Sequence, residues 1–284
     1  MRILITGASG FTGPHLIKEL NRRKHSLYKL KSNLLNTEEL EKELSEVNPE
    51  SVMHLGGLSH LTSSKPDDLY RVNTIGSLNL LSTVSKKCSK TKKIFLASTA
   101  YVYDYDDKKL TEQSPVCPDT HYAMSKLSME YLSDPFKKKF DLVIFRPFNY
   151  TGNGQSAKFF IPKLIKLFKE KQTEIRLGNL DIEREFNDVS WVVSVLADLV
   201  ETADSSNVFN ICSGITYKLR EIIKMLENIT KHSPKIQNEK KLIRSDEKYK
   251  ICGDPSKLFK YLKLHNRFKK LPPLESTIKK MLND

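Results

Sequence analysis

The sequence has little cysteine, no long apolar run and no cluster of metal ligands. Its four cysteines (Cys88, Cys117, Cys212 and Cys252) are widely separated, with no CxxC pair and no clustered histidine partners. This spacing favours reduced structural thiols over a metal site or a disulfide framework. No run approaches the roughly 18 apolar residues of a membrane-spanning helix, and residues 1–7 enter a glycine loop, unlike a secretory signal. We therefore expect a cytoplasmic protein with no membrane partner and no metal.

Binding to nucleic acid is also disfavoured, although a net charge of +13 would attract any polyanion. The lysines are spread over the chain, and no element combines clustered basic residues with interleaved aromatic residues. The 284 residues fit one large domain or two closely joined ones, and a hydrophobic content of 39% is that of a globular protein. We expect a small-molecule ligand and no nucleic acid partner.

A glycine-rich segment follows the first apolar run. Residues 3–5 lead directly into GASGFTG at residues 7–13, which opens an amphipathic segment. Glycines at such positions permit a tight turn and let backbone N–H groups approach a pyrophosphate, which then lies at the positive end of the following helix. Strand, glycine turn and helix in this order predict a dinucleotide-binding unit.

The acidic residue that usually follows such a loop is missing. In dinucleotide-binding folds an Asp or Glu about 20 positions beyond the glycines holds the adenosine ribose hydroxyls. Between Glu19 and Glu38 every charged residue is positive, namely Arg22, Arg23, Lys24, Lys29 and Lys31. Because cations suit a 2′-phosphate better than a bare ribose, the sequence favours NADP(H) over NAD(H).

A tyrosine and a lysine occupy one face of a predicted helix. Tyr122 and Lys126 are four residues apart in HYAMSK, so the phenol and the ammonium can address one small volume. A nearby cation stabilises a phenolate, which makes the pair a candidate general acid/base. The same spacing also occurs on many solvated helix faces, so the pair alone does not decide the function.

Alternating strand and helix patterns fill the first half of the chain. We expect strands near residues 26–31, 51–55, 93–97 and 142–146, and helices at 37–47, 66–89 and 159–169 and around Tyr122. This alternation predicts an α/β fold with a doubly wound parallel sheet. Residues 98–103 emerge at the carboxyl edge of that sheet, where ligands bind.

Five motifs, taken in chain order, resemble the extended short-chain dehydrogenase/reductase family, also called the NAD-dependent epimerase/dehydratase family. They are GASGFTG (7–13), HLGGLS (54–59), STAYVY (98–103), YAMSK (122–126) and RPFNYTG (146–152). Within this family, a second set is similar to GDP-4-keto-6-deoxymannose reductases and related nucleotide-sugar 4-ketoreductases. It comprises GNLDIEREFNDV (178–189), FNICSG (209–214), the Arg244 region and GDPSKL (253–258).

The resemblance implies a division of the chain and a set of residue roles. Residues 1–153 would form a Rossmann-type NAD(P)-binding domain, and 154–284 mainly a smaller C-terminal α/β domain for the nucleotide-sugar, with segments near 184–211 returning to the Rossmann core. Tyr122 would be the acid, Lys126 would lower its pKa and bind the nicotinamide ribose, and Thr99 would hydrogen-bond the reacting oxygen. The implied cofactor-binding residues are Gly7, Gly10, Phe11, Thr12, Gly13, Asn33, Leu34, Leu55, Gly56, Gly57, Tyr122, Lys126 and Pro147. The implied substrate-binding residues are Ser59, His60, Thr99, Asn149, Arg184 and Arg244, with Arg184 on the phosphates.

The sequence departs from the family pattern in four places. Residues 14–50 hold one strand-helix unit where the family usually has two, so we expect a trimmed adenosine side. Asn33 stands where an aspartate commonly meets the adenine, Gly56 and Gly57 replace alanines, and Asp104 replaces a glycine.

The two residues after Thr99 indicate the type of reaction. Related 4,6-dehydratases carry acidic residues there, whereas this chain has Ala100 and Tyr101. The resemblance therefore implies reduction of the 4-keto group of a nucleotide-diphosphate 4-keto-6-deoxyhexose, GDP-linked by preference, for surface polysaccharide synthesis. A nucleotide-sugar 4-epimerase would tolerate the same residues, and a non-catalytic binding member is a third alternative. The family also implies a homodimer that pairs the helices at 66–89 and 121–133.

Overall fold

A six-stranded parallel sheet forms the centre of the molecule. The computed structural model describes residues 1–59, 65–105, 108–239, 241 and 248–284. The strand order is β10-β5-β4-β3-β1-β2, and every neighbouring pair is parallel. The strands are β1 (Arg2–Thr6), β2 (Ser26–Lys29), β3 (Ser51–His54), β4 (Lys93–Ala97), β5 (Asp141–Pro147) and β10 (Asn207–Ile211).

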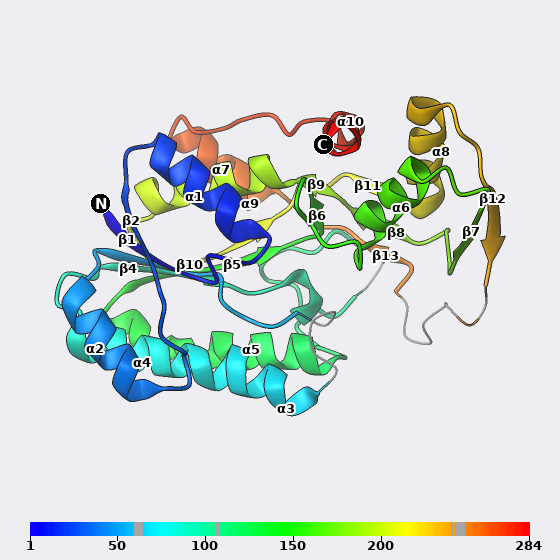
Figure 1. Cartoon of the computed structure of the whole chain (residues 1–284). Helices are drawn as coiled ribbons and strands as arrows, with labels where there is room; N and C mark the ends of the chain where they lie inside the picture. Colours follow the sequence, from blue (N-terminus) through cyan, green and yellow to red (C-terminus); the bar gives the residue numbers. More distant parts are fainter. Residues whose placement is uncertain (60–64, 106–107, 240, 242–247) are drawn as a thin grey trace.

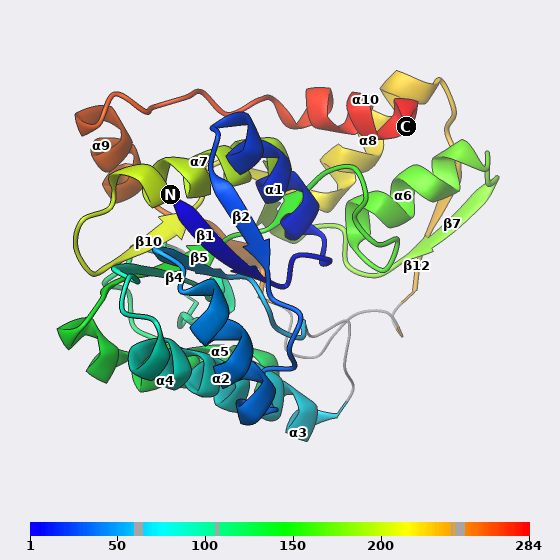
Figure 2. The same ribbon diagram turned by 60° about the vertical axis from the view of Figure 1, so that its left-hand side comes forward.

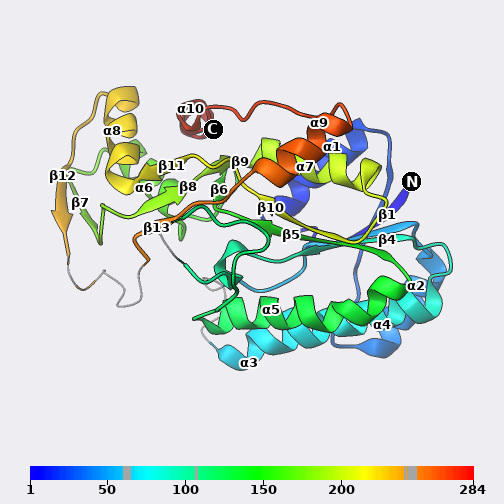
Figure 3. The same ribbon diagram turned by 180° about the vertical axis from the view of Figure 1, so that it is seen from behind.

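Helices cover both faces of this sheet, as Figures 1 and 3 show. One face carries α1 (Thr12–Arg22), α7 (Val189–Thr202) and α9 (Ser256–Leu264). The other carries α2 (Thr37–Val47), α4 (Ser77–Lys87) and α5 (His121–Ser133). Because both faces are covered, the inner strands are continuously apolar rather than alternating. The doubly wound α/β architecture expected from the sequence is confirmed.

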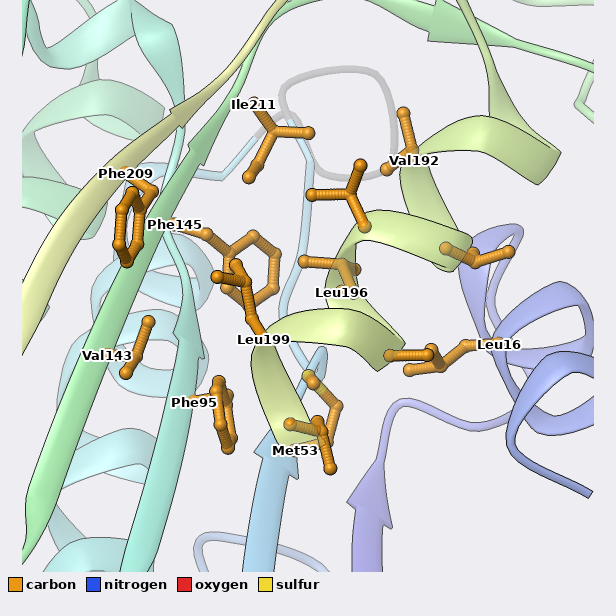
Figure 4. Close-up of a cluster of buried hydrophobic side chains, with 14 of the residues drawn as sticks. Leu16, Met53, Phe95, Val143, Phe145, Val192, Leu196, Leu199, Phe209 and Ile211 are labelled. Atoms are coloured by element: carbon orange, nitrogen blue, oxygen red, sulfur yellow. The ribbon is translucent and has the colours of Figure 1, made fainter. Parts of the chain in front are cut away.

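Two hydrophobic clusters hold the helices to the sheet. In Figure 4, Phe95 of β4 and Phe145 of β5 lie against Leu196 and Leu199 of α7, and all four are fully or almost fully buried. A second cluster joins Leu4, Leu96 and Ile144 to α2 and α4 on the opposite face. Burying an aliphatic or aromatic side chain of this size stabilises a fold by roughly 1.5–3 kcal/mol, so these two layers fix the strands whose ends form the site.

The strand order confirms that one strand-helix unit is missing. Only α1, β2 and α2 lie between β1 and β3, and β2 forms one edge of the sheet. The chain therefore reverses its winding direction between β1 and β3. In open parallel sheets ligands bind at this point, beyond the carboxyl ends of the strands.

A smaller α/β unit lies at one end of the sheet (Figures 1 and 2). Its helices α6 (Phe160–Lys169), α8 (Leu219–Thr230) and α10 (Leu274–Asn283) share a separate apolar cluster with residues of β7 (Glu174–Leu177). The remaining strands of this part are β8 (Glu183–Glu185), β11 (Thr216–Lys218), β12 (Lys235–Asn238) and β13 (Lys250–Ile251). The short pair β6 (Tyr150–Thr151) and β9 (Asn187–Asp188) lies where the chain passes to and from this unit.

The long helix expected at residues 66–89 is interrupted. It consists of α3 (Pro66–Leu69), a π-helical segment η1 (Tyr70–Gly76) and α4. Helix α5 ends at Ser133, and a 3₁₀ turn η3 (Asp134–Lys138) follows around Pro135, which cannot continue the helical hydrogen bonding. A second 3₁₀ turn, η2 (Ala100–Val102), begins directly after Thr99. In the part of the chain described here, no helix is long and apolar enough to cross a membrane.

Candidate active site

A cleft of about 790 Å³ lies between the carboxyl edge of the sheet and the smaller unit. It brings together most of the residues that the sequence singled out. Those lining it are Gly7, Gly10, Phe11, Thr12, Leu55, Gly57, Ser59, Thr99, Tyr122, Lys126, Pro147, Asn149 and Arg184.

Four of the expected cofactor-binding residues do not line the cleft. Gly13 and Gly56 lie in the adjoining backbone, whereas Asn33 and Leu34 are held elsewhere. The Asn33 side chain accepts a hydrogen bond from the Leu35 amide at 2.9 Å, and Leu34 packs against η1 near Gly76. Two expected substrate residues, His60 and Arg244, lie outside the described residues.

The glycine loop fits the backbone of a dinucleotide. Gly7 has a φ of 67°, and a Cβ there would lie 2.7 Å from the Gly56 amide nitrogen. Only glycine therefore suits this close approach beyond the ends of the paired strands β1 and β3. A Cβ at Gly10 would meet only the Gly7 carbonyl, at 3.4 Å, beside the cleft. The first turn of α1 follows, and it presents the positive end of the helix dipole. A diphosphate can therefore approach this backbone.

Helix α5 places Tyr122 opposite Thr99. Thr120 caps the helix by accepting a hydrogen bond from the Ala123 amide at 3.2 Å, which fixes the start of the helix and places Tyr122 in its first turn. Burial raises the pKa of Tyr122, and a side-chain hydrogen bond with Thr99 opposes this rise. The phenol is therefore protonated at neutral pH, as a proton donor must be.

Lys126 lies one turn further along α5 and is only 4% exposed. Burial lowers the pKa of its ammonium to about 8, with Glu130 opposing the change. Its Nζ lies 3.8 Å from the sulfur of Met129. For Tyr122, Thr99 is the group that acts to lower the pKa, and burial outweighs its effect. The role of Lys126 toward Tyr122 stays a prediction.

A buried ion pair supports the floor of the site. Glu130 of α5 accepts hydrogen bonds from Arg146 of β5 at 2.5 and 3.0 Å and from the hydroxyl of Ser98, at the end of β4. The Arg146 guanidinium also lies over the Tyr103 ring, 4.7 Å from its centroid. One carboxylate thus joins the helix that carries Tyr122 to the strand end that carries Thr99.

Asn73, which the sequence analysis did not single out, connects two parts of the site. Its fully buried amide accepts from the Leu58 nitrogen at 2.7 Å and donates to the Leu58 carbonyl and the Ser125 hydroxyl, both at 3.0 Å. It therefore clamps the loop after β3 against α5. No sequence signal separated Asn73 from other polar residues of this stretch, such as Thr74 and Ser77. Its burial makes the pairing necessary, because an unpaired buried amide is costly.

Arg184 faces the cleft, and backbone carbonyls hold its guanidinium. It donates to the carbonyl oxygens of Glu183, Lys248 and Tyr249, at 2.8, 2.7 and 3.3 Å. These three hydrogen bonds hold the Arg184 guanidinium in place and use part of its capacity to donate hydrogen bonds.

The charged side chains that line the cleft are all cationic. They are Lys126, Lys158, Lys163 and Arg184, and no Asp or Glu is among the lining residues that the structure describes. Such a cleft suits an anionic ligand such as a diphosphate. Among its described lining residues there is no carboxylate to move protons at carbon, in agreement with Ala100 and Tyr101.

Part of the argument for NADP(H) is wrong. Arg23 is bound to Asp198 at 2.6 Å, to Glu19 at 2.9 Å and to Glu201 at 3.0 Å, and Arg22 pairs with Glu19. Arg23 thus fastens α1 to α7, Arg22 pairs within α1, and neither is among the residues lining the cleft. Only the lysines at and beyond the end of β2 remain as candidates for a 2′-phosphate. Across the described ranges, no group of three or more His, Cys, Asp or Glu could hold a metal ion.

The fold is that of a doubly wound α/β protein, and its cleft brings Thr99, Tyr122 and Lys126 together at the carboxyl edge of the sheet. Residues 3–212 match the model of the NAD dependent epimerase/dehydratase family. The chain belongs to this family, as the motifs led us to expect.

Two relatives that match nearly the whole chain are named for GDP-linked deoxysugars. The chain is 32% identical over 274 residues to the GDP-6-deoxy-D-talose 4-dehydrogenase of Aggregatibacter actinomycetemcomitans, covering 94% of this chain and 93% of that protein. It is 27% identical over 273 residues to the GDP-6-deoxy-D-mannose reductase of Pseudomonas aeruginosa, covering 90% and 89%. Among solved structures, RMD from Pseudomonas aeruginosa complexed with NADPH superposes with a TM-score of 0.88 at 26% identity, covering 99% and 97%.

Proposed function

We propose that the protein is a NAD(P)H-dependent 4-ketoreductase of a nucleotide-diphosphate 4-keto-6-deoxyhexose, with a GDP-linked sugar favoured. The observation that carries the proposal is the placement of Thr99, Tyr122 and Lys126 in one cationic cleft that no described carboxylate lines. The names of the two curated relatives support a GDP-linked deoxysugar and chemistry at its C4.

The chain's own residues supply the proton and hold the reacting oxygen. Bound NAD(P)H would supply the hydride to C4 of the sugar. Tyr122 then gives its proton to the oxygen, which becomes the new hydroxyl, and Thr99 donates a hydrogen bond to that oxygen as its charge grows. Lys126 supplies a positive charge beside this volume when protonated.

The same cleft disfavours elimination of water. A 4,6-dehydratase must remove and deliver protons at neighbouring sugar carbons, which requires a carboxylate or another base at the ring. Positions 100 and 101 hold Ala100 and Tyr101, and the described lining of the cleft contains no acid. An epimerase, in contrast, requires only hydride chemistry at C4 and is therefore the alternative that the experiment must distinguish.

We still prefer NADP(H) as the cofactor, and the preference now depends on two lysines. Lys29 and Lys31 lie at and beyond the carboxyl end of β2, and both are exposed. A structural neighbour that was crystallised with NADPH supports a nicotinamide nucleotide in this cleft. Tighter binding of NAD(H) than of NADP(H) would contradict the preference.

The proposal also covers the roles of the two domains and the oligomeric state. Residues 1–153 would hold the cofactor, and residues 154–284 mainly the nucleotide-sugar, with segments near 184–211 in the Rossmann core. The protein would act as a homodimer in surface polysaccharide synthesis. Exposed apolar side chains on η1 and α5, among them Ile75, Tyr131 and Leu132, support pairing through these helices.

A substrate panel tests the function. The purified protein is incubated with NADPH or NADH and with GDP-, dTDP- and CDP-4-keto-6-deoxysugars, and absorbance at 340 nm is followed. We expect stoichiometric loss of the reduced cofactor with the GDP-linked ketosugar. Interconversion of 4-epimers with no net change in absorbance would instead identify an epimerase.

A further inference from the structure

A set of contacts crosses from the cofactor loop to the start of the substrate unit. The Thr12 hydroxyl and the Tyr150 hydroxyl are 2.7 Å apart and hydrogen-bonded. The Phe11 ring stacks on the Tyr150 ring with centroids 5.7 Å apart and planes inclined by 20°. Nε2 of His15 lies 2.9 Å from the Asn153 carbonyl oxygen. We call these five residues the Tyr150 bridge.

The bridge lies where both ligands would meet. Phe11 and Thr12 follow the glycine loop at the first turn of α1, and together with Tyr150 they line the cleft. His15 lies in α1 but not in the lining of the cleft. Phe11 and Thr12 therefore face the place expected for the cofactor diphosphate, and Tyr150 faces them from the other wall.

The far end of the bridge is firmly held. Tyr150 pairs with Asn187 in the β6–β9 ladder, and Gln155 donates to the Tyr150 carbonyl at 3.1 Å. Asn187 also donates its backbone N–H to the carbonyl of Asn149, at 2.9 Å. Burial raises the pKa of Tyr150, so the phenol is neutral and can share a hydrogen bond with Thr12. Breaking the bridge is therefore a local event between two anchored segments.

We propose that the Tyr150 bridge closes the cleft over the cofactor diphosphate and limits how fast the cofactor leaves. This inference rests on the proposed use of a nicotinamide dinucleotide. A dinucleotide that lies along the glycine loop can depart only after Tyr150 separates from Thr12 and Phe11. The bridge thereby tunes a property on which reductases and epimerases differ, because a reductase must exchange its cofactor at every turnover and an epimerase retains it.

Two single variants weaken the bridge from different sides. Tyr150→Phe keeps the ring stack and removes the hydroxyl, and His15→Leu removes the contact to Asn153 without altering the lining of the cleft. Since a neutral hydrogen bond is worth about 1 kcal/mol, or a factor of about five, each variant should accelerate NADPH release about fivefold. The double variant should accelerate it further.

The matched control is Tyr261→Phe. It removes another tyrosine–threonine hydrogen bond, from Tyr261 to Thr202 at 3.2 Å, between α9 and α7 and away from the cleft. Release is measured by stopped-flow displacement of fluorescent bound NADPH with excess NADP⁺, and thermal melting is recorded for each protein. We expect faster release from the bridge variants, with melting temperatures close to the parent and the release rate of the control unchanged.

The outcomes separate the bridge from the function. Release at the parent rate, or slower release because Thr12 is freed to bind a phosphate, would overturn the bridge while the parent still binds NADPH and reduces the ketosugar. A parent that binds neither NADPH nor NADH would overturn the proposed function and the bridge together.

Discussion

Burial acts in opposite directions on the two central side chains of the site. It raises the pKa of Tyr122 and holds the phenol as an acid, while it lowers the pKa of Lys126 to about 8. A phenol that stays protonated is suited to reduction, in which the oxygen must receive a proton. A lysine with a pKa near neutrality can change its charge when an anionic ligand arrives.

Replacing Tyr122 by phenylalanine should remove the proton donor and little else. The ring keeps its packing, so we expect turnover to fall by about 10²–10⁴-fold, the usual contribution of a positioned acid. The dissociation constant of NADPH, measured by fluorescence titration, should change little. Tyr103→Phe is the control, because its hydroxyl donates to Asn210 at 2.6 Å and does not line the cleft. Retained turnover in Tyr122→Phe would refute the assignment.

Lys126→Met should trade activity for stability. Burial lowers the pKa of Lys126 in the folded state from 10.5, its value in the unfolded chain, to about 8. The buried charge therefore destabilises the fold most below pH 8, and this destabilisation fades as the pH rises toward 10.5. At pH 7 we expect the variant to gain about 1–3 kcal/mol of unfolding free energy while losing activity. Urea unfolding of parent and variant at pH 7 and pH 9.5 measures the difference. A gain that does not shrink at the higher pH would contradict the explanation.

At the scale of secondary-structure elements, Glu130 connects α5 to the ends of β4 and β5. Glu130→Ala leaves the Arg146 guanidinium buried without its partner, and we expect a loss of about 3–5 kcal/mol in unfolding free energy. The double variant Glu130→Leu/Arg146→Met removes both charges and should be more stable than Glu130→Ala. Chemical denaturation of the three proteins tests this order. A double variant less stable than Glu130→Ala would contradict this order and would show that Arg146 stabilises the fold even without Glu130.

His54 ties β3 to two neighbouring elements and makes the fold sensitive to acid. Its ring nitrogens lie 2.6 Å from the Thr6 hydroxyl and 2.8 Å from the Ser77 hydroxyl, and burial lowers its pKa from 6.5 to about 3. Below pH 6.5 the His54 imidazole takes up a proton in the unfolded chain but not in the folded state. The contribution of His54 to the free energy of unfolding is therefore fully present above pH 6.5 and is lost as the pH falls toward 3. Between pH 7 and pH 5 the loss should be about 2 kcal/mol.

The test of this dependence compares unfolding at the two pH values. His54→Gln lowers stability at pH 7 but should remove most of the additional loss at pH 5. His121→Gln, which removes an exposed imidazole, is the control. An equal loss in the parent and in His54→Gln would assign the acid sensitivity to other groups.

Elements whose signal is local could be predicted from the sequence. The bounds of α2 and β4 match the expected ranges, because the apolar spacing lies within each element and the cap of α2, Asn36, directly precedes it. The π-helical segment η1 could not be predicted, since Asn73 bonds to Leu58 and Ser125, which only the fold brings together. For the same reason, the sequence placed Arg23 in the cofactor pocket, whereas Asp198, far along the chain, binds it.

At the scale of the whole molecule, exposed apolar side chains on η1 and α5 predict a homodimer. Tyr131 is 64% exposed, and Met124 lies seven residues before it on the same face of α5. We expect a mass in solution near twice 32.7 kDa by light scattering. Tyr131→Glu combined with Leu132→Glu should yield monomers, whereas Leu264→Glu, at a still more exposed apolar position on α9, should not. A monomeric parent would remove the dimer from the proposal.

The missing strand-helix unit leaves β2 as one edge of the sheet. Edge strands offer unpaired backbone groups to other chains and thereby invite aggregation. Strand β2 has only four residues, and exposed Lys29 and Lys31 stand at its end, so a second chain would have to bring its backbone against these charges. The opposite edge is partly covered, because Lys257 donates to the Val208 carbonyl of β10 at 2.7 Å. Although one strand-helix unit is missing, neither edge of the sheet therefore invites pairing with a strand of another chain.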